Sequence, residues 1–130
     1  MILLDTHALV YDAIRPQSLS RAAARAINAG IQDGELCCAD VSLWEIATLI
    51  ARGRLKVDAS IDDFLRDVIA RRAFTVLSIT PAIAARAQTI LPVHRDPMDR
   101  IIAATAAVHD ARLITSDETI RAALGRRVIW

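Results

Sequence analysis

Short apolar segments alternate with longer helix-like segments along the whole chain. The predicted strands are Ile2 to Asp5, Leu36 to Ala39, Phe74 to Ile79 and Arg112 to Thr115, with Val128 to Trp130 as a candidate fifth. Strands that alternate with helices are typical of an α/β domain built on a mainly parallel sheet. The pattern therefore predicts an α/β fold with four to five strands.

Helix boundaries are indicated by caps and helix-breaking residues. Helices are predicted near Ala8 to Ile14 and Arg21 to Ala29, from Ser42 to about Ala51, from Ser60 to about Arg72, after Thr80-Pro81, from Asp96-Pro97 through Ala107, and briefly from about Asp117. Pro16 separates the first two, since proline breaks a helix interior. Asn28-Ala29-Gly30 and Asp33-Gly34 are stop signals before the second strand.

The length and composition indicate one domain with a substantial core. The chain has 130 residues, of which 54% are hydrophobic, a high share for a monomer of this size. Two explanations remain open. Either closely packed helices are rich in alanine, or part of the apolar surface lies at an interface with a second copy or a partner helix.

The net charge of +1 gives no global electrostatic reason to expect nucleic acid as a partner. Among the 16 basic residues only Lys56 is a lysine. Arginine suits bidentate phosphate contacts, although a genome-wide bias toward arginine would give the same composition.

The two cysteines favour a reducing compartment. Cys37 and Cys38 are adjacent in a predicted strand and should point to opposite faces of the sheet, so they form no disulfide framework. The chain enters its first strand without a leader-like segment, and no apolar run reaches the roughly 20 residues that span a bilayer. We expect a cytoplasmic protein.

Four segments place a carboxylate where a strand ends or a helix begins. They are Ile2-Leu3-Leu4-Asp5-Thr6-His7, Ser42-Leu43-Trp44-Glu45, Asp96-Pro97-Met98-Asp99-Arg100 and Ile114-Thr115-Ser116-Asp117. If the first and fourth strands are neighbours, their ends meet in one crevice of the sheet. Two unit charges about 5 Å apart repel by roughly 3 kcal/mol at an effective dielectric of about 20. A hard cation such as Mg²⁺ or Mn²⁺ removes this conflict, which points to a metal-dependent enzyme acting on a phosphate ester.

Each of these acids also has a purely structural interpretation. Asp5, Asp96 and Asp117 can each cap the helix that follows, although Thr6 can replace Asp5 in that role. Glu45 with Ser42 fits a capping box, which is the favoured interpretation of that segment alone. Asp99 lies one turn into its helix, where Arg95, Arg100 or a metal can balance its charge. The metal interpretation therefore depends on all four segments together.

These motifs resemble those of the PIN-domain ribonucleases, specifically the VapC-type toxins of bacterial toxin–antitoxin pairs. The resemblance runs from Leu3 to the end of the chain, through Leu3-Leu4-Asp5-Thr6-His7, Ser42-Leu43-Trp44-Glu45-Ile46, Gly53-Arg54-Leu55, His94-Arg95-Asp96-Pro97-Met98-Asp99-Arg100 and Leu113-Ile114-Thr115-Ser116-Asp117. Met98 departs from the aromatic residue common at that position in the family.

The resemblance implies one PIN-like domain over residues 1–130, with a three-layer α/β/α fold. It also implies hydrolysis of RNA phosphodiester bonds by a metal-activated water. Asp5, Glu45, Asp99 and Asp117 would bind one or two Mg²⁺ or Mn²⁺ ions, with Thr6, Asp96 and Ser116 in supporting positions. It further implies a homodimer, a cognate antitoxin and an RNA substrate. Candidate RNA-binding residues are Arg15, Arg21, Arg25, Arg52, Arg54 and Lys56.

Other enzyme classes require residues that this chain lacks at the corresponding positions. A haloacid-dehalogenase-like phosphatase needs an aspartate two positions after Asp5, where this chain has His7. There is no Gly-Lys-Ser/Thr P-loop, and Lys56 lies in the wrong region for a phospho-acceptor receiver domain. The remaining alternative is a catalytically inactive PIN-like module that binds RNA or protein.

Overall fold

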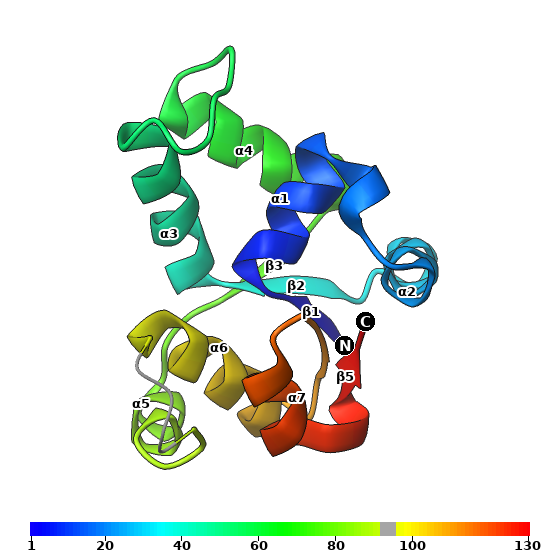
Figure 1. Ribbon diagram of the computed structural model, residues 1–130, viewed down its shortest axis with the longest axis vertical. Helices are drawn as coiled ribbons and strands as arrows, with labels where there is room; N and C mark the ends of the chain where they lie inside the picture. The colour runs from blue at the N-terminus through cyan, green and yellow to red at the C-terminus, as the bar shows by residue number, and fades with distance from the viewer. Residues whose placement is uncertain (92–95) are drawn as a thin grey trace.

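Five parallel strands form a single sheet between two layers of helices (Figure 1). The computed structural model describes residues 1–91 and 96–130. The strands are β1 (Ile2–Leu4), β2 (Leu36–Ala39), β3 (Thr75–Leu77), β4 (Arg112–Ile114) and β5 (Val128–Ile129), and their order across the sheet is β3-β2-β1-β4-β5. Each neighbouring pair is parallel, which confirms the predicted α/β class.

The helices that connect the strands cover both faces of the sheet. They are α1 (Thr6–Ile14), α2 (Arg21–Asp33), α3 (Asp40–Ala51), α4 (Ile61–Arg72), α5 (Pro81–Ala87), α6 (Pro97–Val108) and α7 (Glu118–Leu124), with short 3-10 segments η1 (Pro16–Ser18) and η2 (Gly125–Arg127). Figure 1 shows α1, α3 and α4 above the sheet, α2 at its right-hand end and α5 to α7 below it; residues of α2 belong to the same core as those of α1. Among the described residues, no helix is long and apolar enough to cross a bilayer.

Two hydrophobic cores lie on the two faces of the sheet. Leu4 and Cys38 point into the core under α1 to α4, where they pack with Leu9. Leu3 and Cys37 point into the core over α5 to α7. The adjacent cysteines therefore face opposite sides of β2, as a strand requires. The burial of these alternating side chains in both cores creates the predicted three-layer arrangement.

Two predicted helix starts are wrong, and both errors concern the candidate site. The helix predicted from Ala8 begins at Thr6, with Asp5 as its N-cap. The helix predicted from Ser42 begins at Asp40, with Ala39 as its N-cap. Ser42 therefore lies inside α3, so the interpretation of Ser42 and Glu45 as a capping box is wrong.

The predicted end of α2 is also wrong. The helix continues through Asn28-Ala29-Gly30 and ends at Asp33, before Gly34 in the left-handed conformation (φ 66°). Gly30 is buried inside the helix, where a Cβ atom would collide with the side chain of Leu36. Glycine at this position thus allows α2 to pack closely on β2 instead of stopping the helix.

The third strand is shorter than the predicted Phe74 to Ile79. It covers Thr75–Leu77, because β2 ends at Ala39, which is the residue paired with Leu77. Beyond that point the backbone N–H of Ile79 donates to Asp40 Oδ2 at 3.0 Å instead of to a strand. The length of β2 therefore determines where β3 ends.

Candidate active site at the carboxyl edge of the sheet

The strand order places the ends of β1 and β4 side by side. Leu4 pairs with Ile114, and the N–H of Asp5 donates to the Ile114 carbonyl at 3.1 Å. The connections from β1 run one way through β2 to β3, and the chain then returns to β4 on the other side of β1. Ligands of open α/β sheets bind at such a change of direction, outside the carboxyl ends of the strands.

A cavity of about 350 Å³ opens at this position. It is lined by Asp5, His7, Tyr11, Glu45, Asp96, Asp99, Ser116 and Asp117. All four acids predicted from the sequence therefore line the same cavity, although they come from four separate segments. The predicted supporting residues Asp96 and Ser116 line it too.

Asp5 both caps a helix and lines the cavity. Its Oδ1 accepts from the N–H of Ala8 at 2.7 Å, which fixes the carboxylate at the start of α1. The side chain is buried, with only 8% of its surface exposed. Burial is the main cause that raises the pKa of Asp5 above its ordinary value, and the nearby charge of Asp117 raises it further.

Glu45 is held by a hydroxyl from a different helix. Thr6 Oγ1 donates to Glu45 Oε1 at 2.7 Å, and Thr6 Oγ1 also lies 3.1 Å from Ser42 Oγ. Thr6 and Ser42 are buried, so the contact between them is shielded from water, whereas Glu45 is half-buried and faces the cavity. Burial raises the pKa of Glu45, and the charges of Asp96 and Asp5 raise it further. The supporting position predicted for Thr6 thus corresponds to a direct contact with Glu45.

The other acids belong to the first turns of α6 and α7. Asp96 Oδ1 accepts from the N–H of Met98 at 2.9 Å, so Asp96 caps α6 as expected. Asp99 lies in the first turn of that helix, beside the cavity. Asp117 Oδ1 accepts from the N–H of Ile120 at 2.8 Å and caps α7. Asp96 and Asp117 therefore each do both: they cap a helix and they line the cavity.

The donor set fits a hard divalent cation. Carboxylate and hydroxyl oxygens line the cavity, and such oxygens are the ligands that Mg²⁺ and Mn²⁺ prefer. Burial is the main cause of the raised pKa of Asp5 and of Glu45, and repulsion from neighbouring carboxylates adds to it; a cation bound beside them would favour their ionised forms. Within residues 1–91 and 96–130, no three acidic, histidine or cysteine side chains are already drawn together as a metal cage.

The predicted RNA-binding residues fall into two groups. Arg52 and Arg54 line a groove that shares Glu45 and Asp96 with the acidic cavity. The remaining four, Arg15, Arg21, Arg25 and Lys56, are exposed, but in the described part of the chain they line neither this groove nor the cavity. His94 and Arg95, which belong to the third motif, lie outside the described residues.

Sequence reasoning missed two residues of the cavity, His7 and Tyr11. Both lie on α1 and their rings are 6.4 Å apart. Residues four apart lie on the same face of a helix, and α1 begins at Thr6, before His7. With that helix start, the sequence would have placed His7 and Tyr11 together on the face of α1 next to Asp5. The charge of His7 lowers the pKa of Asp5 and of Glu45, opposing the effect of burial.

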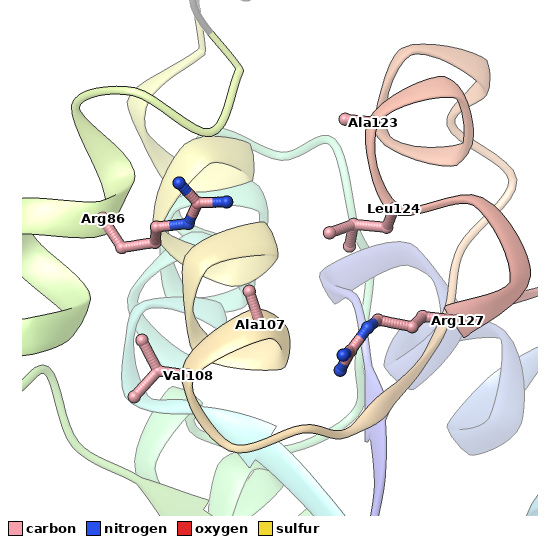
Figure 2. A pocket seen from close by; sticks show the side chains of 6 residues that line it. All are labelled: Arg86, Ala107, Val108, Ala123, Leu124 and Arg127. Carbon is pink, nitrogen blue, oxygen red and sulfur yellow. The ribbon is translucent and has the colours of Figure 1, made fainter.

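A second cavity, of about 320 Å³, has a different character (Figure 2). It lies between α5, α6 and α7, where Arg86 and Arg127 extend toward an apolar floor that includes Ala107 and Leu124. Arg127 also pairs with Asp110. No carboxylate is among the described residues that line it, so it does not share the chemistry of the acidic cavity.

Comparison with known protein families agrees with this geometry. The model of the PIN domain matches residues 2–124. The chain belongs to the PIN-domain family. It is 38% identical over 122 residues to Ribonuclease VapC22 of Mycobacterium tuberculosis, a match that covers 92% of this chain and 89% of that protein. The resemblance to VapC-type members of the PIN-domain family is thereby confirmed.

Solved structures share the fold at lower identity. VapBC2 from Rickettsia felis, bound to a DNA fragment from its promoter, matches with a TM-score of 0.71 and 14% identity, covering 99% of this chain and 96% of that one. A toxin–antitoxin complex from Klebsiella pneumoniae matches with a TM-score of 0.66 and 21% identity, covering 100% and 97%. FitAcB from Neisseria gonorrhoeae matches with a TM-score of 0.66 and 22% identity, covering 98% and 96%.

Proposed function

We propose that this PIN-domain protein is a Mg²⁺- or Mn²⁺-dependent endoribonuclease and the toxin of a toxin–antitoxin pair. The observation that carries the proposal is the cavity at the carboxyl edge of the sheet, where Asp5, Glu45, Asp99 and Asp117 meet. The relative named as a ribonuclease, which is 38% identical, supports RNA as the substrate class.

The four acids would hold one or two divalent ions. When bound there, such a cation would supply charge stabilisation to a phosphodiester and would lower the pKa of a water molecule. Asp5 is oriented for this role by the Ala8 N–H, and Glu45 is oriented by the Thr6 hydroxyl. The ionised forms of both carboxylates are the forms that would bind a cation.

The experiment that tests this function is cleavage of total RNA by the purified protein. We expect cuts in Mg²⁺ or Mn²⁺, none in EDTA, and none from Asp99→Asn. Asp33→Asn, an exposed acid at the end of α2, is the matched control and should cut as the wild type does. Titration with Mn²⁺ by calorimetry should show binding to the wild type and loss of binding in Asp99→Asn.

The alternative is an inactive module that binds RNA or protein without cutting. It gains support if folded protein, free of any partner, binds no Mn²⁺ and leaves the RNA intact. Mn²⁺ binding together with metal-dependent cuts would exclude it, and mapping the cut ends would identify the target sequence.

The proposed partner is an antitoxin encoded beside this gene, and the proposed assembly is a homodimer. The structural relatives support an antitoxin, because one of them is a toxin–antitoxin complex that matches this whole chain. Co-expression with the neighbouring gene product should yield a copurifying complex that does not cut RNA. Light scattering at micromolar concentration should give the mass of a dimer, and a monomer mass would contradict that assembly.

A further inference from the structure

We propose that the groove beside the acidic cavity binds the RNA nucleotide next to the scissile phosphate, with its unpaired base stacked on Trp44. This inference rests on the proposed ribonuclease function and extends it to substrate recognition. This groove, here named the Trp44 groove, is lined by Trp44, Thr48, Leu49, Arg52, Arg54, Pro97 and Met98.

The Trp44 groove runs between α3 and the beginning of α6. Its volume is about 370 Å³. Trp44 and Thr48 of α3 and Arg52, the residue that ends this helix, follow one another at intervals of four, so they form a row along one side of it. Pro97 and Met98, from the first turn of α6, form the opposite wall.

The groove is continuous with the acidic cavity. Glu45 and Asp96 line both of them. A nucleic acid strand whose phosphodiester enters the acidic cavity therefore has a direct path into the Trp44 groove.

Trp44 presents its indole to solvent at the entrance to this path. It is 61% exposed, the highest value among the large hydrophobic side chains of the described residues. Its neighbour Thr48 has its hydroxyl occupied, because Thr48 Oγ1 donates to the Trp44 carbonyl at 2.9 Å. Leu49, Pro97 and Met98 add apolar surface to the same groove, which suits a flat aromatic ligand beside the indole.

The far end of the groove carries positive charge. Arg52 and Arg54 are exposed, and neither forms an ion pair with any residue in the described part of the chain. The turn that carries them is well defined, since Arg54 N donates to the Leu49 carbonyl at 2.9 Å and Gly53 adopts a positive φ of 70°. Two arginines held close together fit the phosphate that follows a stacked base.

These features favour single-stranded RNA as the occupant. Proteins that bind single strands combine aromatic platforms for the bases with a basic path for the backbone, and the groove contains both. A base within a duplex keeps its faces against its neighbours and is not free to stack on a side chain. We therefore expect Trp44 to favour unpaired regions while accepting any of the four bases.

Binding is measured without cleavage and without divalent cations, in protein that carries Asp99→Asn, using a mixed-sequence single-stranded RNA decamer. The chain has two tryptophans, so Trp44→Phe leaves only the signal of Trp130. RNA should quench the fluorescence of the parent protein but not that of Trp44→Phe. Trp44→Ala should weaken binding about ten- to a hundredfold, and Trp44→Phe should weaken it less, because stacking on an aromatic ring persists.

Matched controls separate the groove from the rest of the surface. Ile79→Ala, another exposed hydrophobic residue, should bind the decamer as the parent does. RNA affinity falls as salt rises, and Arg52→Gln and Arg54→Gln should each weaken this dependence. The slope of log affinity against log salt should become less negative by about 0.7 in each variant. Arg66→Gln should leave the slope unchanged, since Arg66 is paired with Asp62 on α4, outside the groove.

The outcomes distinguish this inference from the proposed function. If the wild type cuts RNA, but Trp44→Ala cuts equally well in otherwise wild-type protein and binds the decamer equally well in the Asp99→Asn background, the stacking subsite is wrong and the nuclease stands. If Trp44→Ala keeps RNA affinity but changes the oligomeric mass or loses a copurifying protein, the groove is a protein interface and the inference is again wrong. If folded wild type neither binds nor cuts RNA, both proposals fail.

Discussion

At the scale of single residues, the buried hydroxyl of Thr6 determines how Glu45 is presented to the cavity. Thr6→Val removes the 2.7 Å hydrogen bond to Glu45 with little change in volume, whereas Thr6→Ser retains the hydroxyl. A hydrogen bond to a charged group contributes about 1.5–3 kcal/mol. We expect Thr6→Val to lower the RNA cleavage rate at least about tenfold and Thr6→Ser to stay close to wild type. Full cleavage by folded Thr6→Val would show that Glu45 needs no such support.

Two residues that end helices give a test of backbone conformation. Gly34 and Ala73 both adopt the left-handed conformation, with φ of 66° and 52°. This conformation suits glycine and costs other residues roughly 1–2 kcal/mol. Ala73→Gly should therefore raise the free energy of unfolding by about 0.5–1 kcal/mol, after the entropy gained by the unfolded chain is subtracted. Gly34→Ala should lower it by about 1 kcal/mol, although nothing lies within 4 Å of the added methyl group.

Urea unfolding of the two variants measures both effects. The two changes in the free energy of unfolding should have opposite signs. This is informative because Ala73→Gly removes a methyl group and should still stabilise the protein. Equal destabilisation by both changes would mean that the methyl group of Ala73 makes contacts worth more than its backbone strain.

The residue types at the site were predictable, but their contacts were not. The sequence predicted Asp5, Glu45, Asp99 and Asp117 correctly as residues that meet, because each follows a recognisable strand end or helix start. It paired Glu45 with Ser42 of the same helix, whereas the structure pairs it with Thr6, 39 positions away. Local patterns identify capping boxes readily, and they contain no information on a contact between α1 and α3.

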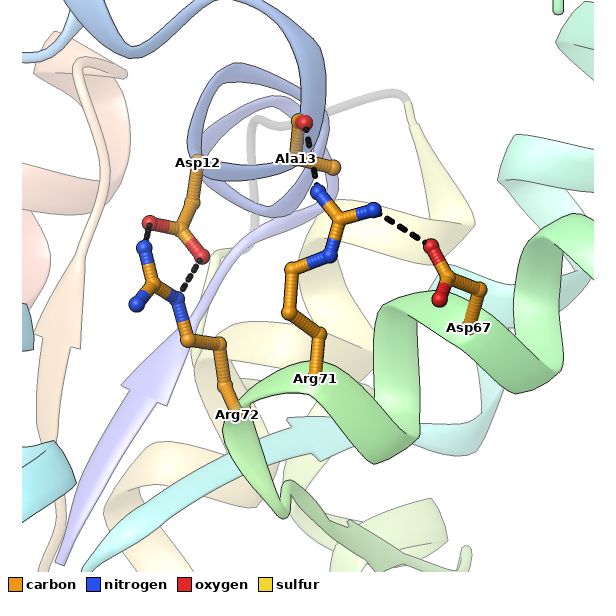
Figure 3. A network of polar contacts seen from close by, with 5 residues as sticks. All are labelled: Asp12, Ala13, Asp67, Arg71 and Arg72. Atoms are coloured by element: carbon orange, nitrogen blue, oxygen red, sulfur yellow. Dashed lines mark hydrogen bonds and ion pairs between the residues drawn. The ribbon is translucent and has the colours of Figure 1, made fainter.

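At the scale of elements, α4 is attached to α1 by an arginine fork (Figure 3). Arg72 Nε lies 3.1 Å from Asp12 Oδ2, and Arg72 Nη2 donates to Asp12 Oδ1 at 3.2 Å. The Asp12 side chain is only 8% exposed. Its neighbour Arg71 donates to the Ala13 carbonyl at 3.4 Å and to Asp67 Oδ2 at 2.6 Å. The last turn of α4 is therefore bound to α1 by these contacts, and α1 is the helix that Asp5 caps.

We expect Arg72→Ala to lower the free energy of unfolding by about 2–3 kcal/mol, because it leaves the buried Asp12 carboxylate unpaired. Arg66→Ala, on the same helix, should change it by less than about 0.5 kcal/mol, since Arg66 and Asp62 are both exposed. The measurement is urea unfolding of both variants. A small loss for Arg72→Ala would mean that Asp12 is hydrated after the arginine is removed.

Element boundaries were predictable where a cap and a proline coincide. Thr80 caps α5 before Pro81, and Asp96 caps α6 before Pro97, as the sequence indicated. Boundaries failed where packing decided them. Gly30 signals a stop in isolation, yet it stays helical because its missing side chain lets α2 lie against Leu36.

At the scale of the whole molecule, the parallel sheet was predictable and its strand order was not. Alternating strands and helices require parallel pairing, but the placement of β4 beside β1 depends on which helices cover each face. The hydrophobic pattern alone did not show which strands are neighbours, whereas the resemblance to PIN-domain proteins implied the three-layer fold. It gave no indication of the Trp44 groove, which exists only because α3 and the start of α6 lie beside each other.

The burial of carboxylates around the acidic cavity should lower the stability of the folded protein when no cation is bound. Burial raises the pKa of Asp5, so at neutral pH its ionised carboxylate is less favourable in the folded protein than in the unfolded chain. Asp5→Asn removes that charge and keeps an oxygen to accept from the Ala8 N–H, and asparagine caps helices as well as aspartate does. In EDTA at neutral pH, we expect Asp5→Asn to melt at a higher temperature than the wild type.

Divalent cations should reverse this order. Saturating Mn²⁺ stabilises whichever protein binds it in the folded state, by about 2.7 kcal/mol at a hundred times the dissociation constant. The wild type should therefore gain melting temperature with Mn²⁺, whereas Asp5→Asn should gain little. Asp33→Asn controls for loss of an acid outside the cavity and should behave as the wild type in both conditions. A wild type that melts above Asp5→Asn in EDTA would mean that Asp5 is held mainly as a structural cap, and the case for a cation at this edge of the sheet would then rest on the other three acids alone.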